Sequence, residues 1–300
     1  MTPPQRTRHP HRGEALPRGA STWDLSTVTG MLTDRDLAII ALLGEHGVLT
    51  TPQLTAAFFH ATHTCANRLR LLRLWGVLDM FVRYRPGYGS LPYHWTLGPL
   101  GARWLALAAD ERPPTVRAVR ERRDRLATSP QLLHLLGTND FFVSLLANSR
   151  AAGDHRSLLR WWSARTTANR FARRIHPDGH GLWQADESKV GFFLEHDTGT
   201  EALDRLVDKI AAYRRLRQDG GPDYPLLFWL PSRTREQNLH RRLNGTDRGV
   251  VVASASRDAA ADPAGPVWKV HGNGRHRLTL ADLPCEHGQP GPLNPPLPEL

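Results

Sequence analysis

Apolar residues in the first third of the chain recur at helical spacing between clear turn signals. Leu37, Ile40 and Leu43 share one face, and Thr33 and Asp36 are placed as an N-cap and its partner at the third helical position. Further helices are predicted over 51–59, from a cap at Thr62 or Thr64 to Trp75, and over 98–108, with strands over 77–84 and 93–97. Three helices followed by a two-stranded wing indicate a winged helix-turn-helix.

The second half of the chain alternates strongly apolar runs of strand length with amphipathic helices. Strands are predicted over 158–162, 182–185, 190–195, 224–230 and 249–254, with an edge hairpin formed by 267–270 and 277–280. Helices are predicted over 129–150 and 233–243, and around the apolar stripe of Leu203, Leu206, Val207 and Ile210. Nearly all-apolar strands between helices favour an α/β domain whose sheet is covered on both faces.

These patterns divide the chain into two domains, and 300 residues are enough for each to have its own hydrophobic core. The predicted parts are a disordered basic arm (1–28), a winged-helix domain (29–110), a charged linker with a helical second half (111–128), an α/β domain (129–283) and a disordered Pro-rich tail (284–300). The fold class is therefore α/β, or α+β for the chain as a whole.

The net charge of the chain indicates the kind of partner it binds. The net charge is +10 and the pI about 10.5, which favours an anionic partner, with nucleic acid ahead of a membrane. Only three of the 39 basic side chains are Lys, so a coding habit that enriches Arg is the alternative explanation. Cys65 and Cys285 give no disulfide framework, and no apolar stretch approaches 18 residues. We expect a cytoplasmic protein without a membrane partner.

The third predicted helix has one apolar face and one polar face. Leu69, Leu72 and Trp75 occupy the first, and the other carries His63, Asn67, Arg70 and Arg73. That polar face could enter the major groove of double-stranded DNA, while Arg83 and Arg85 on the wing would reach phosphates. The alternative is a winged helix used for dimerisation or for docking another protein.

Two acids lie at the ends of neighbouring predicted strands. Asp178 follows a Pro turn before the first strand, and Glu195 ends the second, with a hairpin turn at 186–188 between them. The hairpin brings both carboxylates together, and clustered oxygen ligands suit a hard divalent cation. At about 100° per residue, Lys209 lies roughly 60° round the next helix from Leu206, at the rim of the core-facing stripe.

These residues resemble the PD-(D/E)xK nuclease superfamily. Pro177-Asp178 would be its PD and Glu195 its second acid, while Asp197 stands where the superfamily has its lysine and Lys209 would be a migrated replacement. Lys209-x-x-x-Tyr213 lies where RecB-type members carry Gln-x-x-x-Tyr. The run PDG…FFLEHDTGTE…L…K…Y, with the N-terminal third, is more closely similar to the replication-relaxation family of actinobacterial plasmids and integrative elements, over roughly residues 30–255.

The resemblance implies a restriction-endonuclease-like core that handles a phosphodiester with Mg²⁺ or Mn²⁺. Asp178 and Glu195 would hold the metal, Asp197 would be a further ligand, Lys209 would orient the attacking water, and Tyr213 would brace the helix or a phosphate. Nicking would relax plasmid or mobile-element DNA. The alternatives are a non-catalytic replication or transfer initiator, whose nuclease-like domain is a scaffold, and a transcriptional regulator. A second copy or replication and transfer proteins are the expected protein partners.

Overall fold

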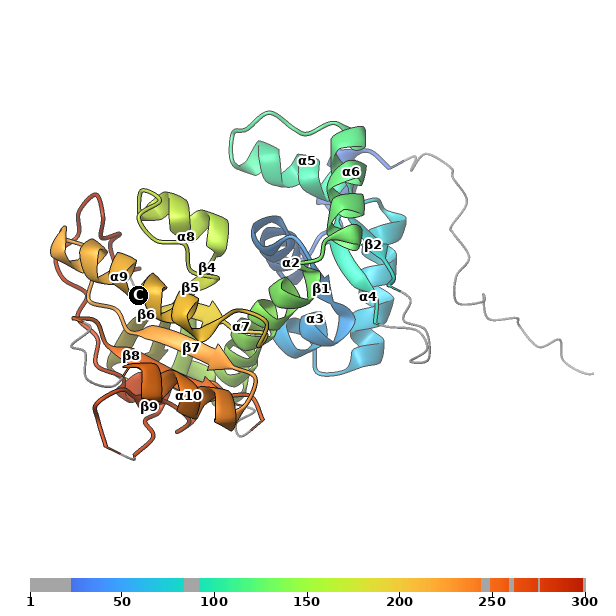
Figure 1. Ribbon diagram of the computed structural model, residues 1–300. Coiled ribbons are helices and arrows are strands. Elements are labelled where there is room, and N and C mark those ends of the chain that lie inside the picture. Colours follow the sequence, from blue (N-terminus) through green and yellow to red (C-terminus); the bar gives the residue numbers. More distant parts are fainter. Residues whose placement is uncertain (1–22, 84–91, 244–248, 259–261, 275, 299–300) are drawn as a thin grey trace, which may run out of the picture.

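The computed structural model describes residues 23–83, 92–243, 249–258, 262–274 and 276–298. It holds two sheets, one of three strands and one of six, and both are surrounded by helices (Figure 1). The mixed α/β class expected from the sequence is confirmed. None of the helices within these ranges is long and apolar enough to cross a membrane.

The small sheet belongs to the N-terminal part of the chain. Its elements are α1 (Leu25–Thr29), α2 (Asp34–His46), β1 (Leu49–Thr50), α3 (Thr51–Phe58), α4 (Thr62–Leu74), β2 (Leu78–Phe81), β3 (His94–Leu97), α5 (Pro99–Ala108) and α6 (Val116–Thr128). The sheet order is β1-β3-β2, and both pairings are antiparallel. The three helices and the hairpin follow the expected order, and the tip of the hairpin lies outside the described residues.

Local chemistry explains where these helices begin. Thr33 and Asp36 form the expected capping box, and Asp36 also pairs with Arg68 of α4, which locks α2 and α4 together. Thr50 and Gln53 form a second capping box at α3. The predicted cap at Thr62 or Thr64 is wrong, because α4 begins at Thr62 after Ala61 and has no side-chain cap.

The large sheet forms the second half of the molecule. Its elements are α7 (Leu132–Ala152), η1 (Gly153–His155), β4 (Arg156–Ser163), α8 (Ala164–Arg170), β5 (Gly179–Ala185), β6 (Ser188–His196), α9 (Leu203–Gln218), β7 (Leu226–Leu230), α10 (Arg233–Leu243), β8 (Val252–Ser256), β9 (Lys269–Val270) and η2 (Leu280–Asp282). The order is β4-β5-β6-β7-β8-β9. β6, β7 and β8 run parallel, and the other pairings are antiparallel.

Alternation along β6 separates the two cores of this half. Phe192 and Leu194 face α7 and pack with Phe141 and Phe142. Phe193 faces the opposite side, where α9 and α10 cover the sheet. Glu195 is the next residue on that side, so its carboxylate is directed toward α9.

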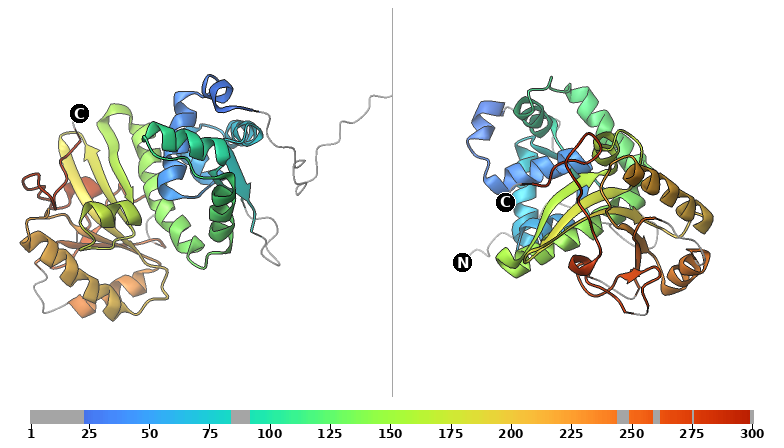
Figure 2. Two further views of the ribbon diagram at one scale, coloured as in Figure 1. Left: turned by 90° about the horizontal axis from the view of Figure 1, so that it is seen from above. Right: turned by 90° about the vertical axis from the view of Figure 1, so that its left-hand side faces the viewer.

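Helix α7 lies between the large sheet and the N-terminal helices (Figures 1 and 2). Gln53 of α3 donates a hydrogen bond of 2.6 Å to Asp140 Oδ1, and Asn139 donates one of 2.9 Å to the carbonyl of Val48. His46 stacks on Trp161 with ring centroids 3.7 Å apart. Polar contacts through α7 and an aromatic contact through Trp161 of β4 therefore join the two halves.

The end of the predicted basic arm and the Pro-rich tail have more structure than expected. Residues 25–28, assigned to the arm, lie in α1, and Val28 is buried. The helix predicted for the second half of the charged linker is α6, which begins at Val116 and whose Leu126 packs with Val48, Phe81 and Leu132. The Pro-rich tail, expected to be disordered, is described as far as residue 298. His287 of the tail bonds the carbonyl of Lys189 at 2.9 Å, next to the turn of the β5–β6 hairpin.

Gly101 in α5 gives a test of this packing. Ala has a higher helix propensity than Gly by about 1 kcal/mol, but a Cβ at Gly101 would lie 2.2 Å from the carbonyl oxygen of Val77. We expect Gly101→Ala to lower the free energy of unfolding by about 1–3 kcal/mol, since backbone cannot move aside cheaply. Denaturant unfolding measures this change. Arg103→Ala, at an exposed position of the same helix, should shift stability by less than about 0.5 kcal/mol, and a stabilised Gly101→Ala protein would contradict the packing.

Candidate functional site

The register of the β5–β6 hairpin brings Asp178 and Glu195 together at one edge of the sheet. Gly179 pairs with Leu194, and the Asp178 N–H donates a 2.9 Å hydrogen bond to the Leu194 carbonyl. Asp178 therefore stands beside Glu195, the penultimate residue of β6. The hairpin turn at Asp186 adopts a positive φ of 49°, which Asp tolerates better than most residues.

Helix α9 supplies both hydrogen-bond donors to Glu195. Lys209 Nζ lies 2.8 Å from Glu195 Oε2, and the Tyr213 hydroxyl donates a 2.7 Å hydrogen bond to Oε1. The two donors are four residues apart, so they share one face of the helix. Tyr213 is buried and turned toward Glu195 rather than toward an incoming phosphate. The structure thus brings together four of the five predicted catalytic residues.

Asp178 is held by two groups that the sequence prediction did not use. The backbone N–H of His196 donates a 2.7 Å hydrogen bond to Oδ2, and His134 Nε2 donates one of 2.8 Å to Oδ1. His134 lies on α7, on the far side of the sheet edge from α9. A sequence signal for the close approach of α7 to the end of β6 was Gly137, because a Cβ there would lie 2.3 Å from His196 Nε2.

A cavity of ≈ 130 Å³ opens over these side chains. Its walls include His134, Asp178, Glu195, Glu201 and Lys209. Glu201, which the sequence prediction also missed, lies 3.3 Å from Lys209 Nζ. The ammonium of Lys209 is therefore shared between two carboxylates at a half-open cavity. Within the described residues, no group of three or more His, Cys, Asp and Glu side chains is arranged to hold a metal ion.

Asp197 is directed to a different partner. Its carboxylate pairs with Arg235 of α10 through Nε and, at 3.1 Å, through Nη2, and it accepts a 2.9 Å hydrogen bond from the Gly199 N–H. Arg235 also donates to the Glu201 carbonyl. Asp197 lines the cavity, yet both its oxygens are engaged in fixing the loop between β6 and α9. This loop carries Glu201.

Burial and neighbouring charge shift the protonation of the cluster. Burial and the charge of Asp178 raise the pKa of Glu195 to about 7, although Lys209 and Tyr213 act in the opposite direction. The hydrogen bond to Asp178 raises the pKa of His134. Burial and the charge of Arg257 lower the pKa of His196 to about 3. The site therefore contains one carboxyl that changes charge near neutral pH.

The predicted DNA-binding residues that the structure describes lie on α4 and just after β2. His63, Asn67 and Arg70 are exposed and Arg73 is half-buried, whereas Leu69 and Leu72 are buried as expected. Arg70 donates a 3.0 Å hydrogen bond to Asn67 Oδ1, so the two side chains lie together on the exposed face. Arg83 follows β2, and Arg85 lies outside the described residues.

The titration of Glu195 is open to direct measurement. We expect its carboxyl carbon to titrate near pH 7 in NMR spectra of the labelled protein. Asp178→Asn should lower that pKa, because it removes a neighbouring negative charge, and Lys209→Met should raise it. Asp186→Asn, on the exposed hairpin turn, should leave it unchanged. An ordinary Glu pKa in the wild type would contradict the buried pair.

Comparison with known proteins supports a family assignment. Two similar solved structures are those of the restriction endonuclease FokI, free and bound to DNA, with 13% identity and TM-scores of 0.26 and 0.24. They cover 75% and 76% of this chain, which spans 42% and 44% of their length. No curated protein matches the chain. The sequence profile named replication-relaxation matches residues 40–225, which is more than half of the 300 residues. The chain therefore belongs to the replication-relaxation family.

Proposed function

We propose that the protein binds double-stranded plasmid or mobile-element DNA and nicks it at the Asp178–Glu195 site. Membership of the replication-relaxation family supports a DNA-related role in replication or relaxation. The single observation that carries the nuclease proposal is the convergence of Asp178, Glu195 and Lys209 on one cavity. Two acids and an ammonium at the end of a hairpin are the groups that the PD-(D/E)xK resemblance requires.

The carboxylates of Asp178 and Glu195 suit Mg²⁺ or Mn²⁺. Burial, together with the charge of Asp178, raises the pKa of Glu195, and a dication would relieve the repulsion between the two acids. The oxygen donors of both carboxylates fit a hard cation. Two carboxylates suffice, since Mg²⁺ is commonly held by one or two of them together with water and substrate phosphates. When bound there, the ion would supply a water of lowered pKa and positive charge for the phosphate oxygens.

The chain's own residues have defined roles in this proposal. Lys209 places an ammonium at the cavity, where it would orient the attacking water and offset charge on the phosphate. Tyr213 and His134 hold the two carboxylates from opposite sides. Asp197 acts through Arg235, by fixing the loop that presents Glu201.

The exposed face of α4 is the proposed DNA-reading surface. Asn67 and Arg70 can donate to base edges, and Arg73 and Arg83 can reach phosphates. Arg68 has a separate role, because it pairs with the buried Asp36. In this proposal one chain combines a DNA-binding surface on α4 with the acidic cavity that would cleave the DNA.

A non-catalytic initiator is the second candidate, and one observation favours it. All four carboxylate oxygens of Asp178 and Glu195 already accept a hydrogen bond from this chain, from His134, His196, Lys209 and Tyr213. A site satisfied in this way can be a purely structural network that shapes a DNA or protein surface.

Nicking of supercoiled plasmid distinguishes the two candidates. With Mn²⁺ or Mg²⁺ we expect conversion to the open circle, slowed on the order of a hundredfold by Asp178→Asn or Glu195→Gln, because each removes a charge that a cation needs. Agarose gels over time measure the rate. Asp186→Asn is the matched control, since it removes an exposed acid. Equal nicking by all four proteins would identify a contaminant and support the initiator.

DNA binding by α4 is tested separately from cleavage. We expect Arg70→Ala to weaken binding by on the order of 1 kcal/mol or more, and Arg73→Ala to reduce the salt dependence by about one phosphate contact. Fluorescence anisotropy with plasmid-derived duplexes, at several salt concentrations and without divalent cations, provides both numbers. Arg117→Ala removes an equal charge from α6, where Arg117 pairs with Glu121, and should have little effect. If all three variants bind alike, α4 is not the contact surface.

A further inference from the structure

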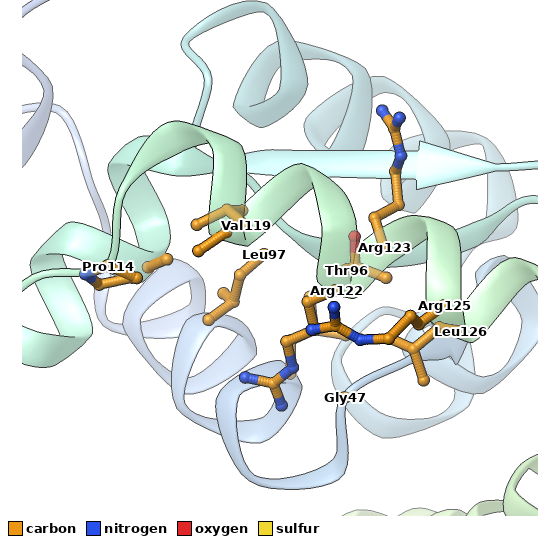
Figure 3. Close-up of a pocket in the computed structure, with 12 residues that line it drawn as sticks. Gly47, Thr96, Leu97, Pro114, Val119, Arg122, Arg123, Arg125 and Leu126 are labelled. Carbon is orange, nitrogen blue, oxygen red and sulfur yellow. The ribbon is translucent and has the colours of Figure 1, made fainter.

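A second cavity lies in the N-terminal half, remote from the acidic site in sequence and in its lining. It measures ≈ 250 Å³ and is enclosed by α2, β3, α5 and α6 (Figure 3). Its apolar walls are Leu43, Leu97, Ala102, Pro114, Ala118, Val119 and Leu126. The volume equals that of about eight water molecules, which is enough for a small organic molecule.

Three arginines of α6 line the same cavity, and their charges are not equally compensated. Arg123 pairs with Asp79 at 2.7 Å and with Asp124 at 2.8 Å. Within the described part of the chain, neither Arg122 nor Arg125 has a carboxylate partner. Arg122 Nη2 has only a long contact of 3.4 Å with the Gly44 carbonyl. The cavity therefore combines an apolar wall with uncompensated positive charge at one end.

The surroundings of Arg122 are themselves basic. Burial and the charges of Arg165 and Arg125 lower the pKa of Arg122. The guanidinium groups of Arg122 and Arg125 on α6 and of Arg165 on α8 thus lie near one another. Among the described residues, no carboxylate forms an ion pair with any of the three. Repulsion among these like charges costs free energy, and a bound anion would offset that cost.

Thr96 provides an independent indication of a ligand. Its side chain lines the cavity from β3 and is only 4% exposed, yet its hydroxyl has no hydrogen-bond partner among the described residues. A buried hydroxyl without a partner costs about 1–3 kcal/mol, so such groups usually have one. Figure 3 shows Thr96 between Arg122 and Arg123 of α6.

We propose that this cavity binds a small organic anion, with an apolar body against Leu97 and Val119 and a carboxylate or phosphate held by Arg122 and Arg125. The Thr96 hydroxyl would donate a hydrogen bond to the same anionic group. Leu126 of the cavity wall also packs with Leu132 at the start of α7, the helix that carries His134. Occupancy would therefore stabilise the packing between α6 and α7, and so connect a metabolite to the part of the chain that holds the acidic site.

Benzoate and phenyl phosphate are suitable probes, because each joins one ring to one anionic group. Saturation-transfer NMR on the full chain should show saturable binding of at least one of them at millimolar concentration, with a rise in the thermal unfolding midpoint. The tighter of the two identifies the carboxylate or the phosphate as the preferred group. Arg122→Gln with Arg125→Gln should weaken binding by roughly tenfold or more.

Two further variants separate the cavity from the general basic surface. Ala118→Phe fills the cavity from the α6 wall and should abolish binding, and Arg120→Gln removes a charge from the same helix without touching the cavity. Circular dichroism checks that each variant is folded, and Thr96→Val replaces any variant that is not. The proposal fails if neither probe saturates, if benzyl alcohol binds as well as benzoate, or if Ala118→Phe binds normally. It also fails if size-exclusion chromatography shows a dimer that Ala118→Phe dissociates, since a second copy would then be the occupant.

Discussion

The burial of the Glu195 carboxylate beside Asp178 is the constraint on which the site depends. A carboxylate that is 2% exposed and next to a second acid is costly unless donors surround it. Lys209 and Tyr213 supply those donors from one face of α9, which fixes how that helix lies on the sheet. The same contacts leave a group with a pKa of about 7, so the cluster is held together and remains sensitive to added charge.

The surrounding structure supports this pair from both sides of the sheet. Helix α7 reaches Asp178 through His134 and approaches closely because residue 137 is Gly. The same helix is bonded to Gln53 of α3 through Asp140, and to the carbonyl of Val48, just before β1, through Asn139. Helix α7 therefore contacts both the acidic cavity and the N-terminal half. A change in the packing of α6 or α3 against α7 would alter the hydrogen bond between His134 and Asp178.

Local patterns in the sequence predicted most of the elements and the hairpin, and through them the meeting of Asp178 and Glu195 with Lys209 at the rim, while the resemblance placed Tyr213 there. They could not predict partners from distant segments. Arg235 carries no local signal, and Gly137 was a weak signal for His134, because both roles depend on how α7 and α10 pack on the sheet. The resemblance implied Asp197 as a further ligand, and strand alternation would place it on the same face as Glu195, but Arg235 of α10 engages its carboxylate there. The α4 cap failed for a simpler reason, since two Thr residues offered a cap and neither is used.

The distribution of Arg and Lys fits the geometry of each position. Arg235 uses two nitrogen atoms on Asp197 and a third acceptor at the Glu201 carbonyl, which suits the planar fork of a guanidinium. Lys209 instead lies between Glu195 and Glu201, at 2.8 and 3.3 Å, where a single compact ammonium serves two separate carboxylates. A guanidinium at 209 would extend farther into a cavity of only ≈ 130 Å³. Under the proposed function it would fill the space that a phosphate needs, which is a physical reason for a Lys at position 209 in a chain whose basic residues are mostly Arg.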